Sequence, residues 1–316
     1  MSYLEITEPL RKLPVADADA VCAIDMGSRV FTLVCGYRLD DRIVTKPICH
    51  APLDLGVHIA RNKGRIGAGK LVEIGAVLAD FRSCSAHLGV TRIIAAATAA
   101  VGRAADAREL LGLGRANDIA MEIADAQREG ELGYLAATQG KPNRLVCKLR
   151  SHSCQVAWQA DAGVTTTIYL DTGYVKAYED FILKASSIGE ATDTFRDFLK
   201  RHVRLPAHGT EQLIALSATA CAAFITGLSE DRVRDTSLSA AAVAARLDEV
   251  QGLLQPEFDA LKNSSGNMAE VLSGLIFLDC LLSRTGHEEV YISGADLPVG
   301  LILEHFDRQG AIGTAG

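Results

Sequence analysis

One order of secondary-structure elements occurs twice along the chain, and this duplication constrains the fold more than any single motif does. In each half, short apolar strands joined by tight turns precede helices that alternate with further strands. This order predicts an α/β fold with helices packed on mixed sheets, because each apolar strand face and helix stripe needs a partner. The length of 316 residues favours two domains over one.

The first half opens on a strand over residues 21–25 that ends in Asp25, followed by a turn at 26–28 and a strand over 30–36. Two apolar strands joined by a glycine turn are typical of a hairpin, and residues 41–50 could add a third strand. Apolar spacing predicts helices over 70–88, 98–111 and 126–137, with a buried strand over 91–96. The turn at 140–143 is a candidate domain boundary.

The second half repeats the pattern. Strands are expected over 145–149, 154–158, 165–170, 213–216 and 289–293, and helices over 190–203, 239–253, 267–284 and 298–306. The chain therefore divides into a flexible lead-in (1–19), a first domain (20–140), a second domain (141–295) and a C-terminal helix (296–316). That last helix could pack back on the first domain.

The overall charge restricts the partners. The formal net charge is −7, and duplex nucleic acid is held through many lysine and arginine contacts to phosphate. We therefore expect no duplex nucleic acid as a partner. A small basic cleft for a polyanion is compatible with an acidic total, because such a ligand needs only a local positive field.

Cysteine usage and hydropathy bear on the compartment. The eight cysteines include no CxxC pair and mostly sit in apolar runs, where a free cysteine behaves as a small hydrophobe. No window approaches the ~20 apolar residues that span a bilayer, and the N-terminus does not read as a signal peptide. The expectation is a reduced, cytoplasmic protein with no membrane partner.

Several segments carry a family resemblance, in order and at similar spacings over residues 20–305. They are A-I-D-M-G-S at 23–28, R-I-G-A-G-K at 65–70, A-A-T-A-A-V at 96–101, a helical run from Glu129 to Leu135, S-S-I-G at 186–189 and Y-I-S-G-A-D-L at 291–297. Together they resemble the Ppx/GppA family, the exopolyphosphatases and guanosine pentaphosphate phosphohydrolases.

This resemblance implies two ribonuclease H-like domains of the actin/hexokinase-like type with an interdomain cleft. It also implies hydrolysis of the terminal phosphoanhydride of polyphosphate or a phosphorylated nucleotide such as guanosine pentaphosphate, with Mg²⁺, by a homodimer. The chain looks like the short form of the family, without the extra C-terminal helical domains of its longer members.

The resemblance also assigns the site. It gives phosphate binding to Asp25, Gly27, Ser28, Thr98, Arg103 and Ser153. Glu129 matches the family's water-activating base, and Asp25 would help to hold the metal. In the intact family site two glycine-rich turns face each other, and their backbone N–H groups cradle phosphate oxygens.

The second of those turns departs from the family pattern. Lys148 stands where the family has an aspartate, and Arg150, Ser151 and His152 stand where it has three glycines. Gln155 replaces a glutamate. Glycine permits positive φ and a close approach of backbone to phosphate, so these side chains would block or redirect that approach. Further differences lie at Arg29, Thr32, Gly102, Ser217 and Pro298.

Two classes of function follow. The first is a hydrolase that acts on phosphoanhydrides. The second is a non-catalytic regulator on the same fold that senses an anion or nucleotide or binds a partner. The added positive charge of Arg29, Lys148, Arg150 and His152 could hold an anion. This suits the second class, because binding alone does not lower the barrier of a reaction.

Simpler interpretations stand beside the functional ones. Asp25 could be a turn-capping residue, and Glu129 could be a solvated helix carboxylate beside Arg128. His152 with Cys147 and Cys154 matches no recurrent zinc spacing. The segment at 64–70 lacks the Ser/Thr after the lysine and the preceding strand of a Walker loop.

Overall fold

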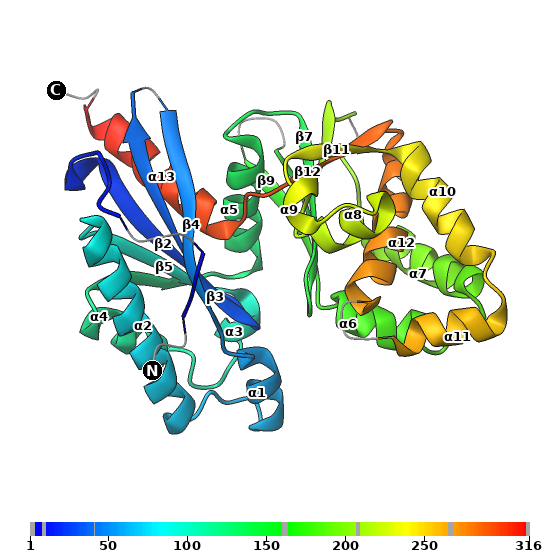
Figure 1. Ribbon diagram of the computed structural model, residues 1–316, viewed down its shortest axis with the longest axis horizontal. Helices are drawn as coiled ribbons and strands as arrows, with labels where there is room; N and C mark the ends of the chain where they lie inside the picture. The colour runs from blue at the N-terminus through cyan, green and yellow to red at the C-terminus, as the bar shows by residue number, and fades with distance from the viewer. Residues whose placement is uncertain are drawn as a thin grey trace. The chain divides into compact units, whose positions relative to one another are not determined.

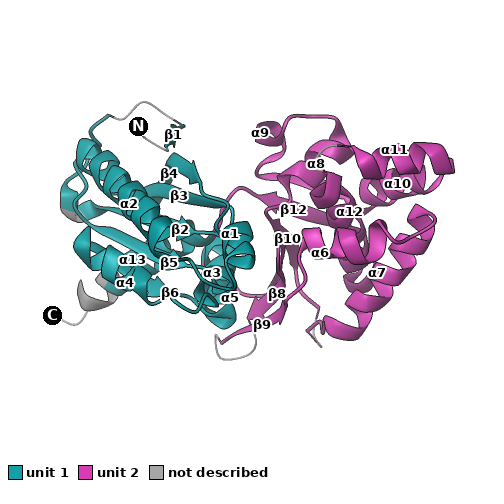
Figure 2. Cartoon of the chain, turned by 90° about the horizontal axis from the view of Figure 1, so that it is seen from below, with its two compact units in different colours: residues 1–139, 297–316 teal, residues 140–296 magenta. Residues whose placement is uncertain are grey.

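The computed structural model describes residues 4–7, 11–40, 42–159, 164–206, 209–264 and 268–313. The chain divides into two compact units (Figure 2). Unit 1 comprises residues 1–139 and 297–316, and unit 2 comprises residues 140–296. Unit 1 is therefore built from two stretches of chain separated by the whole of unit 2.

Unit 1 contains a six-stranded mixed sheet in the order β1-β4-β3-β2-β5-β6. Its strands are β1 (Glu5–Ile6), β2 (Ala20–Met26), β3 (Val30–Leu39), β4 (Arg42–Pro52), β5 (Ile93–Ala97) and β6 (Ile119–Ile123). The first four strands pair antiparallel, and β2, β5 and β6 pair parallel. The parallel strands end at one common edge.

Helices cover both faces of this sheet, as Figure 1 shows. Along β2, Cys22 and Ile24 belong to the core beneath α2 (Ala68–Leu88) and α4 (Glu109–Ala116). Val21 and Ala23 belong to the core on the other face, with α5 (Ala126–Thr138) and α13 (Leu297–Gly313). Side chains alternate across a strand, so burial on both faces explains the continuous apolar run.

Unit 2 contains a second six-stranded mixed sheet, in the order β11-β12-β10-β7-β8-β9. Its strands are β7 (Arg144–Leu149), β8 (Cys154–Gln159), β9 (Thr165–Leu170), β10 (Gln212–Leu216), β11 (Thr236–Ser239) and β12 (Glu289–Ser293). As in unit 1, an antiparallel hairpin of three strands adjoins parallel strands, here β7, β10 and β12.

The helices of unit 2 form its core with this sheet. Those bounded in the structure are α6 (Tyr174–Ala177), the π-helix η3 (Tyr178–Ile182), α7 (Ile188–His202), α8 (Thr219–Thr226), α9 (Glu230–Val233), α10 (Ala240–Gln251), α11 (Gln255–Asn263) and α12 (Met268–Thr285). The side chain of Ser187 caps α7 by accepting the Glu190 N–H, and that of Ser239 caps α10 by accepting the Ala242 N–H.

The fold confirms the α/β class with two mixed sheets and corrects three local expectations. The lead-in contributes β1, which pairs with β4, and a short 3₁₀ turn η1 (Asp17–Asp19). The helix expected over 98–111 is broken into α3 (Ala99–Gly102) and α4. Elements not predicted from the sequence are α1 (Leu55–Arg61), β6, α6, η3, α8, α9, β11 and α11.

Parts of four expectations fall outside the described residues: 1–3 and 8–10 of the lead-in, residue 41 of the third strand, residue 267 of the helix expected over 267–284, and 314–316 of the last helix. All eight cysteines are free and buried. No single helix in the described part of the chain is long and apolar enough to cross a membrane. By length and composition alone α11 and α12, bent by 117° to one another, could do so as a pair.

Candidate functional site

Three sequence-predicted residues come together where the parallel strands of unit 1 end. Asp25 is the penultimate residue of β2, and Thr98 follows β5 directly. The Thr98 N–H donates to the Met26 carbonyl at 3.2 Å. The side chains of Asp25 and Thr98 are both buried. Thr98 therefore lies beside the end of β2, next to Asp25. Ligands of α/β sheets commonly bind at this carboxyl edge.

The turn between β2 and β3 is fixed by its neighbours. The Gly27 N–H donates to the Val30 carbonyl at 3.2 Å and closes the turn. The Ser28 carbonyl accepts the N–H of Gly56 in α1 at 2.6 Å, and the Arg29 carbonyl accepts the N–H of Leu53 at 2.9 Å. Gly27 is buried and Ser28 is half-buried. The polar groups of the turn are therefore held in place by these hydrogen bonds.

Glu129 lies at the same edge, in the first turn of α5. The Ala124 N–H donates to the Ala97 carbonyl at 2.9 Å, which places the start of α5 beside the end of β5. Asp125 caps the helix by accepting the Arg128 N–H at 2.8 Å. The Glu129 side chain is 6% exposed. It is therefore not the solvated helix carboxylate of the simpler interpretation.

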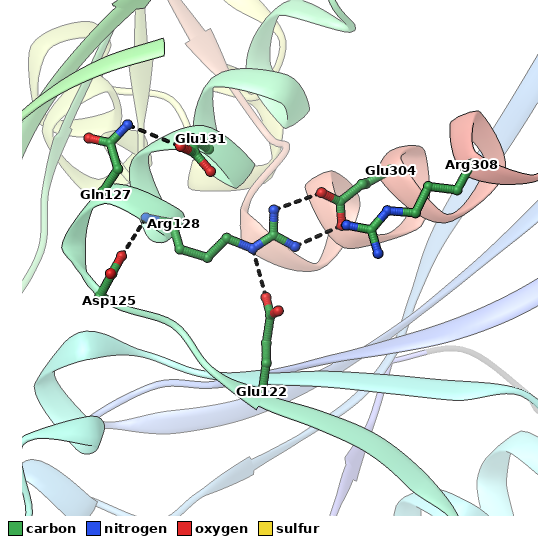
Figure 3. Close-up of polar contacts among 7 residues, drawn as sticks. All are labelled: Glu122, Asp125, Gln127, Arg128, Glu131, Glu304 and Arg308. Atoms are coloured by element: carbon green, nitrogen blue, oxygen red, sulfur yellow. Dashed lines mark hydrogen bonds and ion pairs between the residues drawn. The ribbon is translucent and has the colours of Figure 1, made fainter. Parts of the chain in front are cut away.

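Arg128, the residue before Glu129, fastens α5 to α13 (Figure 3). Its guanidinium donates two hydrogen bonds of 2.7 Å to the Glu304 carboxylate and one of 2.9 Å to Glu122. Arg308 approaches the same carboxylate at 3.1 Å. Hydrogen bonding from Arg128 lowers the pKa of Glu304 below its usual value, against the effect of partial burial. The pair of helices thus holds the first turn of α5, and Glu129 with it.

The segment that resembles the family's R-L-G-E-G stretch is held by one carboxylate. Asp106 accepts the N–H of Ile66 at 2.7 Å and that of Gly67 at 2.9 Å, and Arg65 lies 3.6 Å away. Burial alone would raise the pKa of Asp106, but the two backbone N–H groups and Arg65 together lower it. Arg103, an exposed residue at the end of α3, lies three residues before this carboxylate.

A groove of about 780 Å³ opens beside this segment in unit 1. Its lining includes His58 and Arg61 of α1 and Lys70 of α2. His58 Nε2 donates to the Ile66 carbonyl at 2.8 Å, and Lys70 pairs with Glu73 at 2.8 Å. The hydrogen bond from Gly56 to Ser28 links α1, which contributes to the lining of the groove, to the β2–β3 turn.

In unit 2, the turn at 150–153 has a different backbone from a phosphate cradle. The Arg150 N–H donates to the Ser153 carbonyl at 2.8 Å, closing a tight hairpin between β7 and β8. All four residues of this described turn have negative φ. In an anion nest, successive residues alternate between right-handed and left-handed backbone conformations, which turns their N–H groups toward one point. This turn therefore does not form a nest.

Gly173 locks the same turn from the side. A Cβ atom at Gly173 would lie 2.1 Å from the Arg150 carbonyl oxygen and 2.3 Å from the His152 nitrogen. The Tyr174 N–H also donates to the Arg150 carbonyl at 2.8 Å, and the Ser151 hydroxyl donates to the Tyr174 hydroxyl at 3.1 Å. The backbone of the turn at 150–153 is thus held by its contacts with Gly173 and with Tyr174 of α6. Ser153 is buried, while Arg150 and His152 are half-buried.

Lys148 makes an ion pair where the family resemblance implies an acid. Its side chain is 5% exposed, and its ammonium group donates to the Asp296 carboxylate. The Ser217 hydroxyl donates to the other Asp296 oxygen at 3.3 Å. The family's acidic position is therefore occupied by a cation with its own counter-ion.

The residues present do not fit the expected Mg²⁺ site. Within the described residues there is no group of three His, Cys, Asp or Glu side chains that could hold a metal ion. Asp25 supplies one carboxylate, but the ammonium of Lys148 stands in place of the acid expected in unit 2. A cation held by oxygen ligands needs more carboxylates than this.

Comparison with solved structures identifies the fold. An Aquifex aeolicus PPX-GPPA enzyme matches with a TM-score of 0.78 at 20% identity, over 90% of this chain and 99% of that one. An exopolyphosphatase from Cytophaga hutchinsonii matches with a TM-score of 0.71 at 17% identity, over 91% of this chain and 98% of that one.

The chain has the Ppx/GppA fold. This confirms the architecture expected from the ordered motifs, the actin/hexokinase-like arrangement of two α/β units. No family model and no curated protein matches the sequence. At 17–20% identity, the likeness to these solved structures concerns the fold alone.

Four residues that shape the site were not predicted from the sequence: Asp106, Arg128, Gly173 and Asp296. Their partners are distant in the chain, except for the contacts of Arg128 to its own helix and to β6. Asp125 could have been found, because an aspartate just before an amphipathic helix is a common N-cap.

Proposed function

We propose that this chain binds a phosphorylated ligand at the carboxyl edge of the unit 1 sheet and does not turn it over by the phosphoanhydride mechanism of the Ppx/GppA fold. The ligand class is polyphosphate or a phosphorylated nucleotide. The names of the structural neighbours, a PPX-GPPA enzyme and an exopolyphosphatase, support this class.

The observation that carries the proposal is the buried ion pair of Lys148 with Asp296 beside a turn without a nest. Hydrolysis of a phosphoanhydride depends on groups fixed in advance around the transferred phosphoryl and its charge. In unit 2 the N–H of Arg150 is used within the hairpin, and Gly173 fixes the turn in that form. The turn at 150–153 is thus held as a structural hairpin.

Unit 1 supports binding. Thr98 and Asp25 lie side by side at the edge where the β2–β3 turn presents Ser28 and Arg29. Arg103 supplies a further exposed cation from the end of α3. Local positive charge at a sheet edge suits a phosphate group even on an acidic protein.

The test uses the full chain with Mg²⁺ and polyphosphate, guanosine pentaphosphate or ATP in turn. We expect a rise in Tm of about 2–5 °C with one of them, because a ligand that binds only the native state stabilises it, and no release of phosphate above that of Glu129→Gln. Absence of any Tm rise with all three ligands would contradict the proposal.

A matched pair of variants assigns the binding edge. Thr98→Val removes a buried hydroxyl at the edge, whereas Thr138→Val removes a buried hydroxyl at the far end of α5. The ligand-dependent Tm rise should shrink in the first variant and persist in the second. Equal loss in both would place the ligand elsewhere.

A hydrolase remains the second candidate, and one observation favours it. Glu129 is buried in the first turn of α5 at the same edge as Asp25, which suits a general base. Release of phosphate that is abolished by Glu129→Gln and kept by Glu131→Gln, on the same helix, would establish this candidate. The expected homodimer and cytoplasmic location stay predictions.

A further inference from the structure

A groove of unit 1 that the proposed function does not use lies between α13 and the edge strand β6. Its volume is about 360 Å³, near the small end of the range of about 300–1,000 Å³ in which proteins hold small molecules. In the order of the sheet β6 is the last strand. Ala120 of β6 is exposed and Ile94 of β5 is half-buried, so this end of the sheet is only partly covered.

The floor of the groove is apolar. Ile94 and Ala120 are direct neighbours in the parallel pairing of β5 with β6, and both line the groove together with Leu301 of α13. Ile94 packs against the core to which Leu301 belongs. Paired residues of neighbouring strands share one face of a sheet, so Ala120 extends the same apolar surface outward. A hydrocarbon group of a ligand would gain by burial there.

The polar groups of the groove differ between its two ends. At one end Arg128 donates to both oxygens of Glu304 at 2.7 Å and to Glu122 at 2.9 Å, so its charge is balanced. At the other end His305 and Arg308 of α13 line the groove. The side chain of Arg308 is 71% exposed and meets Glu304 through one nitrogen at 3.1 Å (Figure 3). Within the described residues this is the only ion pair of Arg308, and a guanidinium has five N–H donors.

The end of the groove at His305 has a positive electrostatic field. The pKa of His305 lies below its usual value, first because the ring is partly buried and further because of the positive charges of Arg92 and Arg308. Glu304, on the same helix, already accepts both hydrogen bonds from Arg128. An anionic group at this end would therefore meet unbalanced positive charge.

We propose that this groove binds a small amphipathic carboxylate. The carboxylate lies at Arg308 and His305, because the fork of guanidinium N–H groups matches two carboxylate oxygens. The hydrocarbon part lies on the apolar floor. Ile94 and Ala120 are the second residues of their strands, whereas the proposed phosphate site lies at the carboxyl ends. The groove therefore stands whether or not the proposed phosphate ligand is correct.

The test measures the binding of octanoate to the full chain by isothermal titration calorimetry. We expect one octanoate per chain with a Kd of about 1 mM or below, because a ligand of this size reaches only modest affinity. Octyltrimethylammonium has the same hydrocarbon chain with a cationic head, and acetate has the carboxylate without the chain. Each of these two probes should bind at least fivefold more weakly than octanoate.

Variants test the two halves of the site. Arg308→Gln should weaken octanoate binding at least fivefold, whereas Arg115→Gln, which changes an exposed arginine of α4 outside the groove, should leave the Kd unchanged. Ala120→Phe places a ring over the floor and should abolish binding. Its Tm should stay within about 2 °C of that of the parent chain, because the position is exposed on an edge strand.

Three results would overturn the assignment. The first is no saturable binding of octanoate at ten times the expected Kd. The second is octyltrimethylammonium binding as tightly as octanoate, which would indicate apolar contact without recognition of the carboxylate. The third is unchanged octanoate affinity in Arg308→Gln or in Ala120→Phe, which would place the ligand elsewhere.

Discussion

The Arg128 guanidinium meets the Glu304 carboxylate end-on, through two hydrogen bonds of 2.7 Å from Nη1 and Nη2. Both side chains are largely sheltered, with 22% and 24% exposed. A planar bidentate pair of this kind is among the stronger polar contacts that a protein makes. It joins α13 to α5, the helix that carries Glu129. In the described chain α13 is the only helix of unit 1 that follows unit 2.

Arg128→Met should therefore destabilise unit 1 by about 2–3 kcal/mol, because it leaves Glu304 and Glu122 without their main donor. Urea unfolding of the parent chain, Arg128→Met, Glu304→Gln and the double variant gives the coupling energy. A coupling below about 0.5 kcal/mol would show that the pair contributes little. Lys200→Met, which breaks an exposed pair with Asp197, is the control.

The same pair predicts a pH dependence. Because the hydrogen bonds from Arg128 lower the pKa of Glu304 in the folded state, the unfolded chain takes up this proton first. The resulting stability is complete above the usual glutamate value of 4.5 and is lost as the pH falls through the lower folded value. The Tm difference between the parent chain and Arg128→Met should therefore shrink as the pH falls below the usual glutamate value of 4.5. A constant difference would contradict the assignment.

Lys148→Met tests the buried ion pair of unit 2. Removing one partner of a buried pair leaves a desolvated charge, so we expect a loss of about 3 kcal/mol. Replacing both partners, Lys148→Met with Asp296→Leu, should recover stability to within about 1 kcal/mol of the parent chain. Lys184→Met breaks an exposed pair with Asp180 and should cost less than about 0.5 kcal/mol. An equally large loss in the single and double variants would refute the ion-pair account.

Gly173→Ala tests the lock on the turn at 150–153. Its new methyl group would overlap backbone atoms of Arg150 and His152, which cannot rotate away as a side chain could. We expect a loss of about 3 kcal/mol or more. Gly69→Ala is the control, because a Cβ there meets open space and a helical alanine is favourable. Thermal unfolding measures both, and a neutral Gly173→Ala would show that the turn can shift.

The sequence predicted the sheets well, since alternate residues such as Ile24 and Ala23 are buried on opposite faces of β2. The family resemblance assigned Asp25, Thr98 and Glu129 to one site, and in the structure Asp25, Thr98 and the start of α5 lie where β2, β5 and β6 end. The helix expected over 98–111 failed for a tertiary reason. Asp106 there accepts the N–H groups of Ile66 and Gly67, forty and thirty-nine positions away, and the chain bends to reach them.

The altered second turn shows the limit of reading motifs. Lys148 and the three residues in place of glycines were visible in the sequence as departures. Their consequence depends on Asp296, which lies 148 positions away, and on Gly173 from the start of α6. Neither partner follows from local periodicity or spacing, because both contacts arise only when α6 and the whole unit 2 sheet, in which β10 lies between β12 and β7, have assembled.

The interrupted course of unit 1 has a bearing on how the protein is made. The face of β2 that carries Val21 and Ala23 is covered by Leu297, Leu301, Ile302 and Phe306. These residues belong to α13, which is translated after the whole of unit 2. Unit 2, a continuous stretch, can acquire its whole core earlier. A nascent chain thus exposes this apolar face of the unit 1 sheet while the 157 codons of unit 2 are translated. During that interval we expect it to bind chaperones.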